Sequence, residues 1–401
     1  MDRDIVFVNS LFPCLSETFV YDQFMALHDA GLHFHIVSNH RPAPDQIHPR
    51  MRAIEDEVVY LAESGWQEVL TAHASALRSH PGRYLRSLCL LPFSAEPLRT
   101  TVAQFSGAAL ILHRFGRYRP LHLHAHFTYG ASAVALWAKR LSGTPYSLTV
   151  HGSDLIFDNP PDLLSRLTGA GVIVSISEFN RRYLAEHYPQ IPEERIHLIR
   201  MGIPPGQASQ ERPPAQDKLR ILNVGRLSVH KAQHDLISAC AQLRDQGIDF
   251  TCTIVGEGEL RPTLEKQIAD LNLVAHVTLA GARYHDQVLA LYAEYDVFVL
   301  SSITEGQPIV LMEAMRAGIP IIATRISAIP ELLGECGTLV NPDAPDEISA
   351  ALAKFHDDPA PYQQRALQGI DILRRDYDLQ RNHLRFKDLL RTLSTRPGPS
   401  N

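Results

Sequence analysis

The stretch DVFVLSSITEGQPIVLMEAMRAGIPIIAT, residues 296–324, decides the fold of this chain. Its apolar run Val297–Leu300 has the length and the β-branched content of a buried parallel strand. A turn and a helix follow, and Pro308 suits the first helical position because proline has no N–H group to leave unpaired. Gly318 ends the helix before a second apolar run. The stretch therefore predicts a strand–helix–strand unit of a parallel sheet.

Two glutamates lie in this unit, Glu305 in the turn and Glu313 in the helix. The first backbone N–H groups of the helix, from Gly306 and Gln307 onward, suit a phosphate. Glu313 would repel a phosphate, so it fits better as an acceptor for the two hydroxyls of a ribose. Glu305 can reach hydroxyls beyond the phosphate, and the pattern then describes a nucleotide sugar. On spacing alone, the favoured interpretation is that both are solvated glutamates at a helix start, where the helix dipole favours them. The other motifs of the chain reverse this preference.

Strands alternate with helices along the rest of the chain, which predicts doubly wound parallel sheets. The opening is a strand at Ile5–Asn9, a helix from Ser16 to about Ala30, and a strand at Phe34–Ser38. The turn before that helix has no G-x-G-x-x-G, which counts against an NAD enzyme. The Pro-rich segment 204–217 predicts a linker between a domain at 1–203 and a domain at 218–376. We expect an amphipathic helix near 377–394 and a disordered tail at 395–401.

Length and composition set the class of protein. A chain of 401 residues is long enough for two domains, and a net charge of −6 excludes a general nucleic-acid footprint. The five cysteines are scattered and include no C-x-x-C, as expected for reduced thiols in the cytosol. The sequence has neither a signal peptide nor a membrane span by length and hydropathy. We therefore expect a cytoplasmic protein, with peripheral contact at the inner face of the plasma membrane as an option.

The region that raises this option is rich in arginine. Seven arginines and no lysine lie between Arg78 and Arg119, opposed only by Glu96, and leucines are interspersed. A basic, apolar helical patch of this kind can lie on an anionic membrane, here through residues 78–119. The alternative is a helical hairpin that packs on its own domain with its arginines extended outward.

Histidines gather in the first domain. His122, His124 and His126 alternate, so all three face one side of a strand. A metal site is one interpretation, but no carboxylate supports it nearby, and a structural cluster with satisfied hydrogen bonds is favoured. His126 and, in the segment HGSD (151–154), His151 follow strands at the ends where ligands collect in such sheets.

Three motifs occur together in this chain. The second domain opens with VGRLSVHK (224–231), Glu305 and Glu313 form an E-x7-E motif, and HGSD lies in the first domain. Together they resemble the GT-B glycosyltransferases of family 4. The segments PCLSETF (13–19) and EGQPIVLME (305–313) further resemble the glycosyltransferases of colanic-acid and amylovoran synthesis. The resemblance implies two Rossmann-like domains that face a central cleft, with the helix at 377–394 crossing back to the first, acceptor-binding domain.

The resemblance also implies roles for single residues. Arg226 and Lys231 neutralise the diphosphate, Glu313 holds the ribose, Glu305 holds the donor sugar, and His151 lies beside the anomeric carbon. His151, Glu305, Arg226 and Lys231 are the expected catalytic residues. The expected donor-binding residues are Arg226, Lys231, Gly256, Glu305, Gly306, Gln307, Pro308, Ile309 and Glu313, and the acceptor side includes Ser16, Glu17, Thr18, His126 and Asp154. Ala232 stands where many relatives have glycine, and a small, helix-friendly alanine should matter little.

The expected function is transfer of a hexose from a nucleotide sugar, with UDP as the favoured nucleotide, to a saccharide or a lipid-linked saccharide. The resemblance implies retention of anomeric configuration. Arg226, Lys231 and the helix N-terminus can stabilise the departing diphosphate, so we expect no metal and no other cofactor. Two alternatives remain open: a non-catalytic protein that binds nucleotide sugars, and a GT-B-like epimerase that acts on the nucleotide sugar alone.

Overall fold

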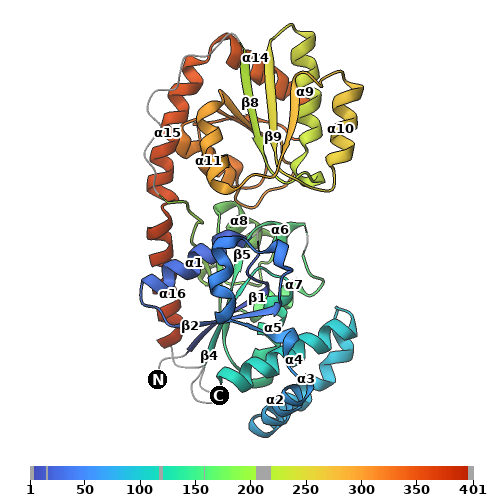
Figure 1. Ribbon diagram of the computed structural model, residues 1–401. Coiled ribbons are helices and arrows are strands. Elements are labelled where there is room, and N and C mark those ends of the chain that lie inside the picture. Colours follow the sequence, from blue (N-terminus) through green and yellow to red (C-terminus); the bar gives the residue numbers. More distant parts are fainter. Residues whose placement is uncertain (1–3, 15–16, 117–120, 158, 205–217, 396–401) are drawn as a thin grey trace. The chain divides into compact units, whose positions relative to one another are not determined.

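The computed structural model describes residues 4–14, 17–116, 121–157, 159–204 and 218–395 (Figure 1). The chain forms two compact units. The first unit contains residues 1–200 together with 380–401, and the second unit contains residues 201–379. Of the expected linker only Pro204 is described, and of the expected tail only Thr395, which ends the last helix. No described helix is long and apolar enough to cross a bilayer.

The first unit is built on a seven-stranded parallel sheet with the order β3-β2-β1-β4-β5-β6-β7. Its strands are β1 (Asp4–Leu11), β2 (Phe34–His40), β3 (Val58–Tyr60), β4 (Leu121–His126), β5 (Tyr146–Val150), β6 (Val172–Ser175) and β7 (Ile196–Leu198). Its α-helices are α1 (Thr18–Asp29), α2 (Trp66–Ser79), α3 (Pro81–Leu90), α4 (Leu98–Phe115), α5 (Gly130–Ser142), α6 (Ser153–Ile156), α7 (Leu163–Gly169), α8 (Glu178–His187) and α16 (Leu379–Thr395). Short 3-10 helices are η2 (Pro44–Gln46), η3 (Pro49–Glu57), η4 (Leu61–Glu63), η5 (Leu91–Phe93) and η6 (Glu193–Arg195).

The second unit has a six-stranded parallel sheet with the order β10-β9-β8-β11-β12-β13. Its strands are β8 (Leu219–Val224), β9 (Phe250–Val255), β10 (Val277–Gly281), β11 (Val297–Leu300), β12 (Ile321–Thr324) and β13 (Thr338–Val340). Its helices are η7 (Val229–Lys231), α9 (Gln233–Asp245), α10 (Arg261–Asp270), α11 (His285–Glu294), α12 (Ile309–Ala317), α13 (Ile329–Leu333), α14 (Pro345–Asp357) and α15 (Ala360–Asp376).

Each sheet buries both of its faces, as a doubly wound fold requires. Along β1, Val6 and Val8 enter one apolar cluster, whereas Ile5 and Phe7 enter another. The strand β8 divides its side chains in the same way between two clusters of the second unit. The parallel, doubly wound architecture predicted from the alternating strands and helices is confirmed.

The last helix, α16, belongs to the first unit although the second unit precedes it in the chain. Its residues Phe386, Leu390 and Leu393 are buried in the same cluster as Ile5 and Phe7 of β1. The amphipathic pattern expected near 377–394 therefore describes a helix that completes the core of the first unit.

Candidate active site

An ion pair joins two loops of the second unit. Lys231 Nζ lies 2.5 Å from Glu305 Oε1, and Ser302 Oγ donates to the same carboxylate oxygen at 2.7 Å. The backbone fixes these loops as well, because Ser301 Oγ donates to the carbonyl of Lys231 at 3.0 Å. Glu305 is buried and Lys231 partly buried. The structure thus brings together a cation and a carboxylate that lie 74 positions apart in sequence.

The start of α12 leaves backbone donors available. Among the described residues, no acceptor is found for the N–H groups of Gly306, Gln307 and Ile309. Pro308 precedes α12 as its N-cap, so the prediction that it occupies the first helical position is wrong by one residue. Gln307 is anchored by its side chain, which accepts from the Met201 N–H at 3.2 Å. A helix start with free donors beside a lysine favours an anion.

Glu313 is buried inside α12 and is held by two residues that the sequence analysis missed. His285 Nε2 lies 2.6 Å from Glu313 Oε1, and the Tyr292 hydroxyl donates to Glu313 Oε2 at 3.2 Å. Burial raises the pKa of Tyr292, and the neighbouring carboxylate adds to this rise, so its hydroxyl keeps its proton. His285 and Tyr292 are seven positions apart on α11, a spacing that places them on one helix face and was the available signal.

Gly256 follows β9 at a point where two backbones meet. A β-carbon at Gly256 would lie 2.0 Å from the carbonyl oxygen of Gly225, and its φ of +147° disfavours other residues. The close approach lets the loop after β9 lie directly against the loop that carries Lys231. The observed role of Gly256 is therefore to fit these loops together, and its expected contact with a donor remains a prediction.

Arg226 and Ala232 differ from what the sequence suggested. The Arg226 side chain is 76% exposed and lies 3.6 Å from the Glu259 carboxylate, so it is not gathered with the Lys231–Glu305 pair. Ala232 has φ +43° and ψ +42°, a left-handed conformation in which glycine is less strained. The expectation that alanine matters little because it is helix-friendly is therefore wrong in its reason, since the position is not helical.

In the first unit, Asp154 ties together the ends of two strands. Its carboxylate accepts the backbone N–H of His151 at 2.8 Å and that of Thr128 at 2.9 Å. Burial raises the pKa of Asp154 to about 6, although these donors counteract the rise. Asp154 thus positions His151 and the loop after β4, whereas the sequence analysis placed it on the acceptor side without assigning this contact.

His126 and His151 approach each other at the ends of β4 and β5. His126 Nδ1 lies 3.4 Å from His151 Nε2, and the ring of His151 packs against Phe127 and Phe19 at centroid distances of 4.1 and 5.1 Å. Burial lowers the pKa of His126 to about 3, and burial with the nearby His126 lowers the pKa of His151 well below 6.5. Both rings are therefore neutral near pH 7. The buried His151 Nδ1 atom has no hydrogen-bond partner among the described residues.

The other predicted acceptor residues lie at the start of α1. Thr18 opens the helix and Glu17 is its N-cap residue, whereas Ser16 lies outside the described residues. Burial raises the pKa of Glu17 to about 8, and no described group bonds its Oε2 atom. Phe19, two residues on, contacts His151. The structure therefore brings the beginning of α1 to the end of β5 through an aromatic contact.

The two halves of the chain match two family models. Residues 16–207 match "Glycosyltransferase Family 4", and residues 207–369 match "Glycosyl transferases group 1". The chain belongs to the family 4 glycosyltransferases.

Named relatives extend the comparison. This glycosyltransferase is 28% identical to the putative colanic acid biosynthesis glycosyltransferase WcaL of Escherichia coli K12, over 95% of this chain and 98% of that protein. It is 39% identical to the amylovoran biosynthesis glycosyltransferase AmsK of Erwinia amylovora, over 35% of this chain and 37% of that protein.

Solved structures share its GT-B fold. Sucrose-phosphate synthase from Thermosynechococcus elongatus matches with a TM-score of 0.74 and 18% identity, covering 98% of this chain and 99% of that one. Anabaena HepE, solved in complex with UDP and glucose, matches with a TM-score of 0.70 and 17% identity, covering 97% and 100%. These similarities establish the two-domain α/β fold of the glycosyltransferase.

Two histidines of the cluster in the glycosyltransferase, His122 and His124, form hydrogen bonds to a neighbouring strand. His124 bonds the hydroxyls of Ser147 and Thr149 at 2.8 and 3.0 Å, and His122 Nε2 lies 2.9 Å from Ser147 Oγ. The favoured interpretation of satisfied hydrogen bonds is confirmed for His124, whose two ring nitrogens are both bonded. His122 and His124 are buried in the sheet, whereas His126 lies against His151.

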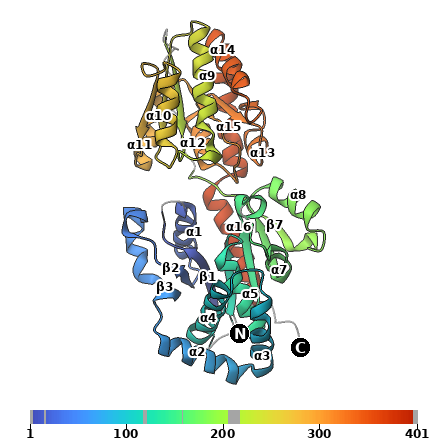
Figure 2. The same cartoon turned by 90° about the vertical axis from the view of Figure 1, so that its right-hand side faces the viewer.

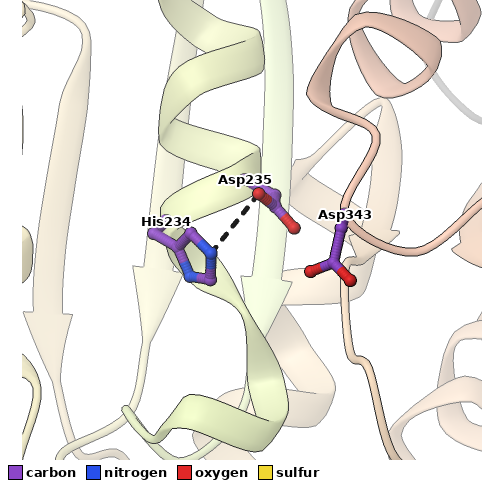
Figure 3. A group of neighbouring side chains, drawn as sticks. All are labelled: His234, Asp235 and Asp343. Carbon is purple, nitrogen blue, oxygen red and sulfur yellow. Dashed lines mark ion pairs between the residues drawn. The ribbon is translucent and has the colours of Figure 1, made fainter.

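One group of described side chains has the composition of a metal site. Figure 3 shows Asp235 between His234 and Asp343, with one oxygen turned to each side. His234 Nε2 lies 3.4 Å from Asp235 Oδ1, and the nearest potential ligand atoms of the three residues lie within 4.8 Å of one another. Ligands about 2.1 Å from one ion lie roughly 3 to 3.5 Å apart, so the spacing is loose for a bound ion. The contact is explained as an ion pair, and no step of transfer is assigned to it.

Proposed function

We propose that this glycosyltransferase moves a hexose from a nucleotide sugar, with UDP as the nucleotide, to a saccharide or lipid-linked saccharide during synthesis of an exopolysaccharide. The observation that carries the proposal is the Lys231–Glu305 pair beside the free N–H groups at the start of α12. A cation and helix-terminal donors suit a diphosphate, while a carboxylate held next to them suits sugar hydroxyls.

The buried carboxylate of Glu313 fits the ribose in this proposal. Carboxylate oxygens accept hydrogen bonds from hydroxyls, and Glu313 is already oriented by His285 and Tyr292. A carboxylate that is hydrogen-bonded at both oxygens presents its remaining lone pairs in a fixed direction. Such preorganisation lowers the entropy that donor binding would otherwise lose.

Charge stabilisation of the leaving group is the main catalytic contribution that we assign to the second unit. When the bond between the anomeric carbon and the phosphate oxygen breaks, negative charge grows on the diphosphate. Lys231 and the N–H groups of Gly306 and Gln307 would stabilise that charge without a metal ion. The guanidinium of Arg226 would contribute a second positive charge after a change of side-chain rotamer. Electrostatic groups of this kind contribute about 10² to 10³ in rate each.

We further propose that transfer retains the anomeric configuration by attack from the face of the departing phosphate. The acceptor oxygen forms the new bond to the anomeric carbon, and its proton passes to the phosphate oxygen that leaves. Neutral His151 would act on the donor sugar as an uncharged ring rather than as a cation. A trapped glycosyl–enzyme adduct would contradict this route.

The comparisons support the substrate classes without fixing them for this chain. HepE was solved with UDP and glucose, which supports a UDP donor, and WcaL and AmsK are named for colanic acid and amylovoran synthesis, which supports a polysaccharide product.

A donor panel tests the proposal. The purified chain is incubated with UDP-, GDP- and ADP-hexoses, with and without a saccharide acceptor and with excess chelator, while nucleotide release is measured. We expect release only when UDP-hexose and acceptor are both present, undiminished by chelator, and an α-linked product by NMR. Conversion of the donor alone would indicate an epimerase, binding without turnover a non-catalytic protein, and loss of activity in chelator a metal requirement. Lys231→Gln should lower the rate of release by about 10³, whereas His230→Gln, a change at the exposed neighbouring residue, should have little effect.

A further inference from the structure

Exposed apolar side chains concentrate on one part of the first unit. Of the seventeen large apolar side chains that are exposed in the described chain, nine lie between residues 66 and 102, and we call this surface the 66–102 face. Its members are Trp66, Leu70, Leu77, Leu85, Leu88, Leu90, Phe93, Leu98 and Val102. Isolated exposed leucines are ordinary, but such a concentration indicates a surface that another body covers.

The apolar residues of α2 form a stripe. Trp66, Leu70 and Leu77 recur at helical spacing and are 71%, 59% and 41% exposed, whereas Ala72 and Ala76 on another face of the helix are buried. The helix is thus packed on the protein through small residues and presents its large ones outward. This is the reverse of the usual pattern for a surface helix in water.

Neighbouring elements continue the 66–102 face. Helices α2, α3 and α4 pack together and lie side by side at one end of the first unit in both views (Figures 1 and 2). Leu85 and Leu88 are exposed on α3, and Leu98 and Val102 on the first turns of α4. Phe93, in the connection between these helices, is 84% exposed.

The charges around the 66–102 face are of one sign. Arg78, Arg83, Arg86 and Arg99 are exposed, and none has a carboxylate partner among the described residues. The acidic residues of the same helical region are neutralised, because Arg114 Nε lies 2.6 Å from Glu68 and the buried Arg166 pairs with Glu96. Four exposed cations therefore lie on the same three helices as the exposed apolar side chains. Of the expected patch at 78–119, residues 117–119 lie outside the described residues.

We propose that the 66–102 face docks on the surface of a bilayer that contains anionic lipid. The arginines match the lipid phosphates, and the apolar side chains enter the boundary between headgroups and acyl chains, where tryptophan is favoured. Unpaired cations beside apolar side chains fit a bilayer better than a second copy of the chain. Although each copy carries a net charge of −6, a symmetric contact would bring the same four arginines of both copies together, and these would repel one another. The inference goes beyond the proposed transfer reaction and does not depend on which donor is used.

The two tryptophans make the test direct. Trp66 is 71% exposed and Trp137 is 3% exposed, so a change of tryptophan emission on binding reports Trp66. The full chain is mixed with phosphatidylcholine vesicles that do or do not contain 30% phosphatidylglycerol. We expect a blue shift of emission and flotation with the anionic vesicles at low salt, quenching by brominated acyl chains, and release at about 0.5 M salt, where charges are strongly screened.

Matched variants separate the apolar and charged contributions. Each arginine near an anionic surface strengthens binding about fivefold, so Arg86→Glu with Arg99→Glu should weaken vesicle binding by at least about thirtyfold. Phe93→Ser with Leu70→Ser removes apolar contacts and should weaken it about a hundredfold, while Trp66 remains as the reporter. Arg52→Glu with Arg385→Glu changes the net charge equally at exposed positions outside the face and should have little effect, as should Val274→Ser.

Four outcomes would overturn the proposal: no binding of the wild-type chain to anionic vesicles; binding that survives both face variants; equal losses in the control variants; or a dimer that vesicles do not dissociate and that Phe93→Ser abolishes. Turnover of a soluble acceptor by the face variants shows that they fold and keeps this outcome distinct from failure of the transfer reaction.

Discussion

The two units organise their buried polar groups in opposite ways. In the second unit, Lys231 and Glu305 carry opposite charges and hold each other at 2.5 Å. In the first unit, His126 and His151 have pKa values lowered by burial and meet as neutral rings. The first arrangement suits a charged ligand, whereas the second suits hydroxyl groups. The comparison teaches that one chain can hold a charged set of buried side chains in one unit and an uncharged set in the other.

Breaking the ion pair should have the largest effect. Lys231→Ala and Glu305→Gln should each lower kcat/KM by about 10³, because one removes a charge that stabilises the leaving group and the other frees the lysine and loses a sugar contact. The double variant should lose less than the product of the two losses, since the residues act as a unit. Steady-state kinetics of nucleotide release measures all three, and fully additive losses would show that the pair does not act together.

Gly256→Ala tests whether the loops of the second unit depend on close backbone approach. We expect a loss of at least about 3 kcal/mol in its free energy of unfolding, because the new β-carbon would lie 2.0 Å from the Gly225 carbonyl oxygen. Gly247→Ala is the control, since Gly247 also has a positive φ of +78° but has nothing within 4 Å. Thermal unfolding followed by circular dichroism measures both, and equal losses would show that φ alone matters.

His151→Ala examines the uncharged side of the comparison. We expect a loss of about 10² in kcat/KM, because a positioned hydrogen bond is removed from the reaction site. His151→Gln keeps an N–H donor and should recover about tenfold of this loss. If a cationic imidazole were needed instead, glutamine would recover nothing and the rate would fall as pH rises through the pKa of that group.

Acid should destabilise the first unit. Burial lowers the pKa of His126 to about 3 and of His383 to about 4, and lowers those of His124 and His151 well below 6.5. The unfolded chain binds these protons from pH 6.5 downward and the folded chain does not, so stability is present above pH 6.5 and falls below it. Each such histidine lowers the free energy of unfolding by about 1.4 kcal/mol for each pH unit below 6.5.

Two carboxyl groups oppose this loss in part. The raised pKa values of Asp154 (about 6) and Glu17 (about 8) let the folded state hold protons that the unfolded state has released, so acid stabilises these two sites. The four histidines lower the free energy of unfolding by more than the two carboxyl groups raise it, so acid lowers the stability of the first unit. Both tryptophans, Trp66 and Trp137, lie in the first unit, so urea unfolding followed by tryptophan fluorescence at pH 7 and pH 5 measures it. An unchanged midpoint would contradict the burial of neutral histidines.

The smallest effect is expected at Ala232. Ala232→Gly removes the strain of an alanine in the left-handed conformation, but it also increases the conformational entropy of the unfolded chain. These effects oppose each other, so the free energy of unfolding should change by less than about 1 kcal/mol. Ala239→Gly, at an equally buried position inside α9, should cost more than about 1 kcal/mol because it has no strain to relieve. Equal costs would show that position 232 is not strained.

Much of the fold could be predicted because buried parallel strands leave a plain sequence pattern. The strand at Val297–Leu300 was predicted with the observed bounds, and the strands predicted at Ile5–Asn9 and Phe34–Ser38 lie within β1 and β2, since each contains a run of β-branched and other apolar residues. The strands β3 and β13 were not predicted. Each has three residues at a sheet edge, which is too short to show periodicity.

The candidate site could be predicted only where local sequence determines it. Glu305 and Glu313 follow from the strand, turn and helix around them. The contact of His285 with Glu313 joins residues 28 positions apart and depends on how α11 packs, which the sequence alone does not specify. The left-handed conformation of Ala232 is set by the turn between η7 and α9 rather than by the preference of alanine.

The return of α16 to the first unit affects how the protein is made. Its buried residues Phe386 and Leu390 complete a core that begins at Ile5, so the first unit lacks part of its interior until nearly the whole chain has left the ribosome. The second unit, residues 201–379, is complete in sequence before that moment. The first unit therefore cannot complete its core before the second unit has been synthesised.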